Sequence, residues 1–258
     1  MMKFQRIDSS QLSKPERILW NYGITDPAEI DLEAIAFDLG ATVRYRKLDG
    51  CDARIVGNTT TAIISINTDS YPTRQRFSLA HEIGHWHEDR GTGALPCAAE
   101  DIGPQNAEAR SKEATANAFA SQLILPDYLF KPRASGLFPI LDTASCLAEE
   151  FNASLTATSI KLTKVSSMAT IAVCHSQTQR EWFVRSNAAL SSDIWPIKQI
   201  HHDTNAFELL FGGSSSKSAQ KNEPAHKWLT GSNIFNSTVK VQSTKLPDGT
   251  VLSLLFVI

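Results

Sequence analysis

The chain has 258 residues, of which 42% are hydrophobic, so it is long enough to fold as more than one unit. Its 25 Lys and Arg residues against 27 Asp and Glu residues give a net charge of −2, which excludes a global positive field that would attract nucleic acid or an anionic membrane. No apolar run approaches the roughly 18 residues of a membrane helix, and no secretory apolar stretch is present near the N-terminus, so we expect a cytoplasmic protein. The four cysteines are widely spaced and favour free thiols in a reducing compartment.

The first part of the chain alternates between helix and strand signals. Apolar residues recur at helical spacing over residues 28–40, between Pro27 and Gly40, which predicts a helix that ends at the glycine. Three β-branched or alternating segments follow, and we expect them to form a small antiparallel sheet: TVRYRKL, DARIVG and TTAIISIN.

Two further helices are predicted after these strands. Residues 73–89 carry apolar side chains at helical spacing directly after Pro72, which suits the first position of a helix. Residues 108–125 resume the same periodicity until Pro126 ends it. The segment between the two helices, residues 90–106, is predicted to be a loop because of its Gly and Pro content.

The remainder of the chain predicts a helical pair and then a strand-rich unit. Residues 141–165 resemble a helix-turn-helix, with the turn at residues 152–154. Beyond Ser167 the pattern predicts a flexible loop over residues 212–222 and a hairpin turn over residues 247–249. The strands expected there are MATIAVC, EWFVRS, TVKVQST and TVLSLLFVI, so we place a domain boundary near Ser167.

The first of the two central helices carries the sequence His81-Glu82-x-x-His85. A helix rises about 1.5 Å per residue, so the two histidines lie about one turn apart and can direct two imidazole nitrogens at one ion. Glu82 lies at the edge of that face, where its carboxylate can act as a general base on a water molecule. His87 is predicted to point away as a solvated surface residue. Because this motif also arises by chance on exposed helices, a third ligand must decide whether it is a metal site.

Glu113, on the second central helix, is the candidate third ligand. Asn117 follows it one turn later, and both lie on a face that the apolar residues leave free. A zinc site needs a carboxylate or similar ligand and an outer group that orients a histidine, and this pair can supply both. The sequence therefore predicts a zinc site formed by His81, His85 and Glu113, with Mn²⁺ as an alternative metal.

The segments RFSLAHEIGHWHEDR and EATANAFASQLILP resemble the two signature segments of the ImmA/IrrE metallopeptidases. This resemblance implies that His81, His85 and Glu113 hold zinc and that Glu82 is the base. It covers residues 27–126 with specific motifs and the segment LAEEFNAS more weakly. In one departure from some relatives, we expect no repressor-type DNA-binding domain ahead of the peptidase.

The resemblance also implies a fold and a function. The expected fold is α+β, with a zincin-like metallopeptidase domain at residues 1–135, a helix-turn-helix-like unit at residues 136–166 and a GAF-like α+β regulatory domain at residues 167–258. The expected function is that of a zinc-dependent endopeptidase which cleaves a helix-turn-helix transcriptional repressor and so derepresses stress or mobile-element genes. We expect the TTAIISIN strand, just before the zinc helix, to pair its edge with an extended substrate.

Other chemically interesting residues are assigned to packing or to the surface. Cys97 lies in the loop between the two helices and is expected to be a plain thiol rather than a cap on the metal. His201 and His202 are adjacent, so their side chains should diverge without sharing a metal. The core of the C-terminal domain, which could enclose a small-molecule pocket, is expected to contain three tryptophans: Trp182, Trp195 and Trp228.

Two other functions stay open at the level of sequence. The first is a transcription regulator that binds DNA itself and keeps a structural metal. Direct nucleic-acid binding is unexpected, because the net charge of the chain is close to zero. The helix pair also offers only two lysines to phosphate, Lys161 and Lys164, and its first helix carries Glu149 and Glu150. The second is a stress sensor or toxin–antitoxin component with a silent metal site, against which the complete set of ligands and base argues.

Overall fold

The computed structural model describes residues 8–90, 107–212, 217–231 and 234–258. The chain has a mixed α+β fold that divides into two compact units. Unit 1 comprises Met1–Pro132 and Glu150–Ser154, and unit 2 comprises Arg133–Glu149 and Leu155–Ile258. The division into three domains stays a prediction. Within the described ranges, no helix combines the length and the apolar character that a bilayer crossing requires.

Unit 1 begins with two short helices that their caps define. Helix α1 (Lys14–Asn21) starts at a capping box in which the Glu16 side chain accepts hydrogen bonds from Ser13. Helix α2 (Leu32–Asp38) starts at Asp31, whose carboxylate accepts hydrogen bonds from two backbone N–H groups of the first turn. The helix that was predicted over residues 28–40 is shorter in the structure, because a separate 3₁₀ turn (Pro27–Glu29) takes up its first part.

Gly40, which ends this helical segment, has a backbone φ of +89°. A Cβ atom at this position would lie 2.7 Å from the carbonyl oxygen of Thr60. Both the positive φ and the close approach of the neighbouring backbone therefore require glycine. The chain turns here directly into the first strand.

A three-stranded sheet follows, formed by β1 (Ala41–Arg46), β2 (Ala53–Gly57) and β3 (Ala62–Asn67). Its order is β1-β3-β2, with β3 parallel to β1 and antiparallel to β2. The prediction of a purely antiparallel sheet is therefore wrong. The turn between β2 and β3 is tight, because the Asn58 side chain accepts hydrogen bonds from the backbone N–H groups of Thr60 and Thr61. After this turn, β3 lies between the other two strands.

The central place of β3 overturns a second expectation. The TTAIISIN segment forms this strand, and both of its edges are already paired with neighbours. A substrate cannot add to a strand whose backbone groups are used on both sides. The edges that remain open in the described sheet belong to β1 and β2.

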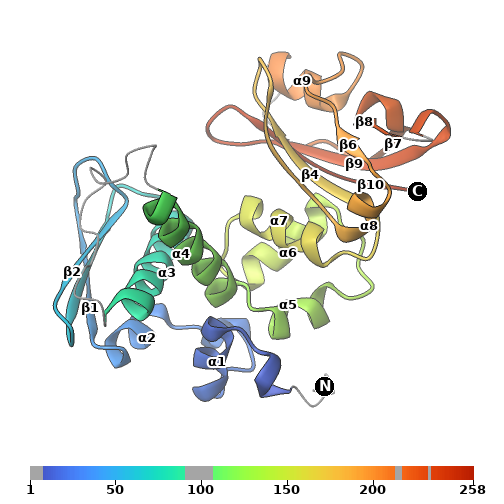
Figure 1. Cartoon of the computed structure of the whole chain (residues 1–258). Helices are drawn as coiled ribbons and strands as arrows, with labels where there is room; N and C mark the ends of the chain where they lie inside the picture. Colours follow the sequence, from blue (N-terminus) through green and yellow to red (C-terminus); the bar gives the residue numbers. More distant parts are fainter. Residues whose placement is uncertain (1–7, 91–106, 213–216, 232–233) are drawn as a thin grey trace. The chain divides into compact units, whose positions relative to one another are not determined.

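The two central helices are α3 (Pro72–Asp89) and α4 (Ala107–Ile124), and they pack side by side (Figure 1). Pro72 occupies the first turn of α3, and Pro126 follows the end of α4, as the sequence predicts. Helix α3 packs against β2 and β3. The side chains that fill the space between and around these elements are fully or almost fully buried: Ile55, Ile64, Ile66, Leu79, Ala80, Ile83, Trp86, Ala116, Phe119, Ala120 and Leu123.

Unit 2 is built on a five-stranded antiparallel sheet of order β5-β4-β10-β9-β7. Its strands are β4 (Thr170–His175), β5 (Arg180–Arg185), β7 (Lys221–Pro224), β9 (Thr238–Lys245) and β10 (Val251–Val257). Four of these strands match the predicted segments. Strand β7 was not expected, because its first residues belong to a polar segment that was predicted to be a loop.

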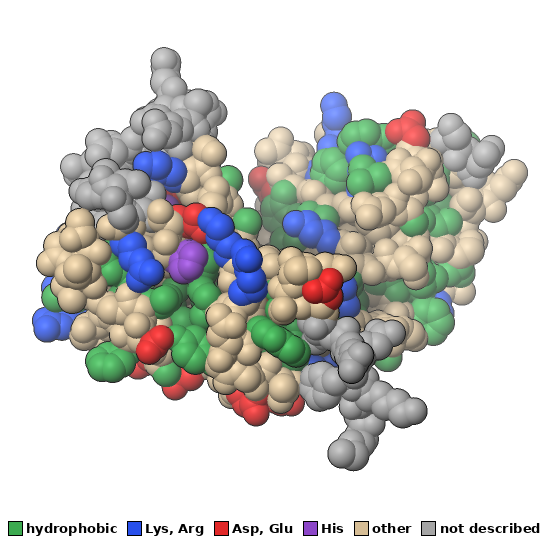
Figure 2. Space-filling model, turned by 60° about the horizontal axis from the view of Figure 1, so that its bottom comes forward, with side chains coloured by type: hydrophobic (Ala, Val, Ile, Leu, Met, Phe, Trp, Pro, Cys, Tyr) green, Lys and Arg blue, Asp and Glu red, His purple; other side chains and the backbone are tan. Residues whose placement is uncertain are grey.

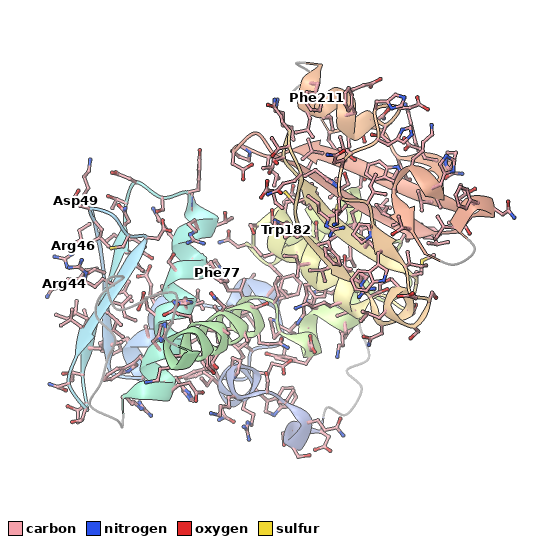
Figure 3. The ribbon with its side chains drawn as sticks, turned by 45° about the horizontal axis from the view of Figure 1, so that its top comes forward. Arg44, Arg46, Asp49, Phe77, Trp182 and Phe211 are labelled. Atoms are coloured by element: carbon pink, nitrogen blue, oxygen red, sulfur yellow. The ribbon has the colours of Figure 1, made fainter. Side chains whose placement is uncertain are left out.

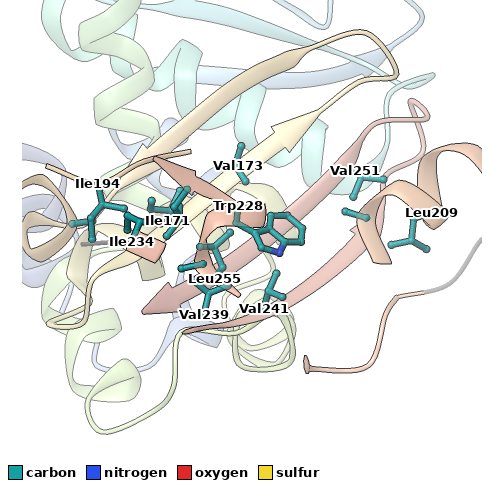
Figure 4. Close-up of a cluster of buried hydrophobic side chains, with 14 of the residues drawn as sticks. Ile171, Val173, Ile194, Leu209, Trp228, Ile234, Val239, Val241, Val251 and Leu255 are labelled. Carbon is teal, nitrogen blue, oxygen red and sulfur yellow. The ribbon is translucent and has the colours of Figure 1, made fainter. Parts of the chain in front are cut away.

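One face of this sheet carries an apolar core around Trp228 (Figure 4). This core is formed or bordered by two short helices, α8 (Asn187–Ser191) and α9 (Asn205–Phe211). A small two-stranded ribbon of β6 (Trp195–Pro196) and β8 (Leu229–Thr230) also contributes to it or borders it. The Trp228 indole N–H donates a 2.6 Å hydrogen bond to the Glu223 carboxylate within this region. Trp228 is only 1% exposed, so its polar atom is satisfied inside the core.

The predicted helical pair corresponds to α6 (Leu141–Glu150) and α7 (Leu155–Val165), which follow the short helix α5 (Asp127–Ala134). Asn152, in the connection, has a φ of +48°, which asparagine tolerates better than most residues. Within unit 2, α7 packs against β4 and β5. Lys161 is buried, so of the two lysines on α7 only Lys164 is exposed to solvent.

Candidate metal centre

The candidate site lies where α3 and α4 face each other. His81 and His85 are one turn apart on α3, and their Nε2 atoms approach to 3.0 Å. Glu113 projects from α4, with one carboxylate oxygen 3.2 Å from His81 Nε2 and the other 3.2 Å from His85 Nε2. The three side chains that the sequence predicts as ligands therefore meet at one place.

The donor set fits a small divalent cation. The three side chains His81, His85 and Glu113 each offer one ligand atom, and these three atoms lie within 4.8 Å of one another. Such a group could hold a metal ion. A tetrahedral ion with bonds of about 2.0–2.1 Å separates its ligand atoms by about 3.3 Å. The observed separations of 3.0–3.2 Å are close to that spacing. Two imidazoles and one carboxylate leave a fourth position free for water or substrate.

Asn117 fixes the orientation of one histidine. Its Oδ1 atom lies 3.1 Å from His81 Nδ1, which confirms the predicted contact between this amide and a histidine. Because an amide oxygen can only accept, the proton must be on Nδ1 and the lone pair on Nε2. That lone pair then faces His85 and Glu113, as a metal ligand requires.

The electrostatics of the site favour the neutral form of His81. Burial lowers the pKa of His81, and the neighbouring His85 and the guanidinium of Arg74 lower it further, against the opposing effect of Glu113. A histidine must be neutral to bind a metal, so this shift favours binding at neutral pH. Figure 2 shows a histidine side chain at the surface with Lys or Arg side chains near it.

Glu82 is the buried carboxyl group of this region, with 9% of its surface exposed. Burial raises the pKa of Glu82 to about 7, and the negative charge of Glu113 adds to the effect. A bound cation would favour the carboxylate and draw this pKa down. Glu82 is then a carboxylate at neutral pH, which is the form that can accept a proton from water.

Close packing of the two helices brings the donors together. Gly84 lies between the histidines on α3, and a Cβ atom there would be 3.2 Å from Cβ of Phe119 on α4. Any side chain at this position would press against Phe119, which lies on the same helix as Glu113. The glycine in the motif therefore permits the helix contact on which the site depends.

Arg74 is a residue near the site that was not predicted from the sequence. It lies two turns before His81 on α3, and its guanidinium is held by Asp52 at 2.8–2.9 Å. Asp52 in turn accepts a 2.6 Å hydrogen bond from the Ser70 hydroxyl. The seven-residue spacing between Arg74 and His81 was the available signal, because residues two turns apart share a helix face.

Two other residues near the motif have separate outcomes. His87 does not join the cluster, as predicted, but it is only partly solvated because its ring packs 5.3 Å from that of Phe119. Cys97, predicted to be a plain loop thiol, lies outside the described residues.

The histidines and tryptophans of unit 2 correct two expectations. His201 and His202 do not diverge, because they lie in an irregular segment where their rings stack at 4.5 Å. Among the described residues they belong to no metal-holding cluster. Trp195 is 42% exposed and is not a core residue, whereas Trp228 is buried and Trp182 is partly buried. Trp195 instead lies at the edge of the unit, with the guanidinium of Arg185 stacked 3.5 Å from its ring centre.

Residues 36–163 match the family model described as the IrrE N-terminal-like domain. The chain belongs to the ImmA/IrrE metallopeptidase family. The match includes α3, α4 and all three clustered side chains, so the ImmA/IrrE segment coincides with the candidate metal centre.

A solved structure of a Mycobacterium tuberculosis transcriptional regulator is similar to this ImmA/IrrE chain. The TM-score is 0.60 at 12% sequence identity, and the similarity covers 94% of this chain and 74% of the other. At this identity the comparison shows a shared fold. A search of curated proteins gave no match.

We expect the purified protein to bind one divalent metal ion, and Glu113→Ala to weaken that binding by about 10-fold or more, because the variant loses one of three convergent ligands. His87→Ala is the matched control, since this histidine lies on the same helix outside the cluster. Titration with Zn²⁺ followed by metal analysis measures both. Equal zinc content in the wild type and Glu113→Ala would remove Glu113 from the ligand set.

Proposed function

We propose that the chain is a zinc-dependent endopeptidase in which His81, His85 and Glu113 hold the metal and Glu82 is the general base. The observation that carries the proposal is the convergence of two imidazole nitrogens and a carboxylate from two packed helices. A buried carboxyl group lies beside them on α3. Family membership supports the same reaction class.

Each side chain has a defined task in the proposed hydrolysis. Zinc, when bound, supplies Lewis acidity that polarises the scissile carbonyl and lowers the pKa of water. Glu82 accepts the proton of the attacking water and then delivers it to the nitrogen of the leaving amine. Asn117 holds the His81 ring in one tautomer and orientation throughout.

An extended substrate segment requires a strand edge near the site. Strand β2 is an open edge of the described sheet, and α3 packs against both β2 and β3. We therefore assign substrate pairing to β2 in place of the central strand β3. Backbone hydrogen bonds to this edge would hold a peptide without regard to most of its side chains.

For the substrate, we propose a helix-turn-helix transcriptional repressor whose cleavage derepresses stress or mobile-element genes. The resemblance of the signature segments to the ImmA/IrrE metallopeptidases motivates this choice. Within the same proposal, unit 1 contains a zincin-like peptidase and unit 2 contains a helix-turn-helix-like pair followed by a GAF-like regulatory sheet. The five-stranded antiparallel sheet of unit 2 supports the GAF-like assignment. Both of its faces are covered, and β4, its first strand along the chain, lies beside β10, its last.

Cleavage of a candidate repressor tests this function. The metal-loaded protein is mixed with the small repressor encoded nearest to its gene, and fragments are followed by mass spectrometry. We expect fragments that disappear when a chelator is added and return when Zn²⁺ is restored, because the reaction depends on the ion. Tight binding of the repressor without any cleavage would instead favour a regulator with a silent metal site.

A further inference from the structure

The sheet of unit 1 has an outer face on the side away from α3. Side chains alternate between the two faces of a strand, so the residues that neighbour the inward Ile55, Ile64 and Ile66 point outward. The strand register arranges the outward residues in three rows. They are Thr42–Ile63–Val56, Arg44–Ser65–Arg54 and Arg46–Asn67.

Three arginines dominate this outer face. Arg44, Arg46 and Arg54 are all exposed, and none makes an ion pair with an acidic side chain of the described chain. Figure 3 shows Arg44 and Arg46 on the side of the sheet away from α3. Asp49 lies beyond the strand ends, in the connection between β1 and β2. The charge of the face is therefore positive and is not neutralised from within the described chain.

The geometry of the sheet holds these charges close together. Arg44 and Arg54 both stand beside Ser65, on opposite neighbouring strands, so their Cα atoms lie about 10 Å apart. Ser65 is only 2% exposed, which is consistent with the aliphatic parts of both arginines lying across it. Like charges at this spacing are within about one Debye length of each other and repel, so an anionic partner would relieve the repulsion.

An apolar row borders the charged row. Val56 is 54% exposed and Ile63 is 40% exposed, and they lie opposite each other on β2 and β3. The face therefore offers both guanidinium groups and β-branched aliphatic side chains. A matching partner must carry carboxylates or phosphates next to apolar groups.

Protein fits this chemistry better than nucleic acid. The outward rows contain no aromatic side chain on which bases could stack, and a phosphate backbone has no apolar part to cover Val56 and Ile63. The chain as a whole has a net charge of −2, so it lacks a long-range attraction for polyanions. Acidic protein segments combine carboxylates, which pair bidentately with arginine, with apolar side chains.

We propose that this outer face is a docking surface for an acidic, partly apolar segment of a partner protein. Carboxylates of the partner pair with Arg44, Arg46 and Arg54, and its apolar residues cover Val56 and Ile63. The surface lies on the opposite side of the sheet from α3, so a docked segment leaves the metal centre accessible. The proposal does not depend on the proposed peptidase function.

Binding of labelled peptides to the whole 258-residue chain tests the docking surface. The probes are a short peptide of alternating Glu and Leu, the same peptide with Gln in place of Glu, the same peptide with Ser in place of Leu, and a thymidine oligonucleotide. We expect the Glu-Leu peptide to bind most tightly in fluorescence anisotropy at physiological ionic strength. The triple variant Arg44→Gln, Arg46→Gln, Arg54→Gln should weaken that binding by about 10-fold or more.

A second triple variant controls for net charge. Arg17→Gln, Lys131→Gln, Lys198→Gln removes the same three positive charges from exposed positions outside this sheet and should bind as the wild type does. Circular dichroism and zinc content establish that both variants are folded. An equal loss in the two variants, stronger binding of the oligonucleotide, or no binding of the Glu-Leu peptide to the wild type would each overturn the proposal.

Discussion

Replacing Glu82 by Gln is expected to lower the rate of substrate cleavage by about 10²- to 10⁴-fold, the usual contribution of a general base. The substitution keeps the size of the side chain and its fit in α3, but an amide cannot accept the proton of the attacking water. Glu82 is not among the three clustered ligands, so the variant should retain as much zinc as the wild type. The measurements are the cleavage rate of the repressor and the zinc content of each protein.

Glu88→Gln provides the matched control for this experiment. Glu88 lies on the same helix and forms an ion pair with Lys14 at the surface of unit 1. An exposed pair of this kind contributes at most about 1 kcal/mol to stability, so the variant should cleave as fast as the wild type. If Glu82→Gln also cleaves at the rate of the wild type, Glu82 is not the base.

Trp228→Ala is expected to destabilise unit 2 by about 3–5 kcal/mol, which is typical of removing a large aromatic side chain from a core. Trp228 is 1% exposed and lies within the apolar cluster of the five-stranded sheet. Its loss also leaves the Glu223 carboxylate, which is 9% exposed, without the indole N–H that it accepts. Denaturant-induced unfolding followed by circular dichroism measures the change in the free energy of unfolding.

Trp195→Ala is the comparison for that measurement. Trp195 is 42% exposed, the Arg185 guanidinium stacks on its ring, and its indole N–H donates to the exposed Asp193 side chain, so its removal should cost about 1 kcal/mol. Both tryptophan variants should retain metal, because His81, His85 and Glu113 all lie in unit 1. Similar losses of stability in the two variants would contradict the assignment of Trp228 to the core.

The sequence alone predicted the two central helices and the three side chains that meet between them. Helical periodicity is a local property, and His81 and His85 share a face by their spacing alone. Glu113 could be predicted because it and Asn117 form a polar pair on a second helix that is otherwise apolar on its packed side. Their meeting requires only that the two helices pack with their polar pairs facing each other.

The arrangement of the strands could not be predicted in the same way. Alternation of side chains indicates a strand but does not say which other strand it pairs with or in which direction. The central position of β3 depends on contacts between segments that are distant along the chain. Trp195 illustrates a related limit, because apolar neighbours in the sequence do not show that a ring on a short edge ribbon is left exposed.

The insertion of β3 between β1 and β2 also bears on the order of folding. Pairing of β2 with β3 crosses a short turn, whereas the parallel pairing of Ala41 with Ala62 must close a much longer loop. The hairpin is therefore the element that can form early, and its docking on β1 comes later. Because residues 68–71 join β3 directly to α3, the late step also sets where α3 begins. His81 and His85 lie in the second half of that helix, so we expect a nascent or partly unfolded chain, in which the sheet is incomplete, not to present the donor atoms as a set.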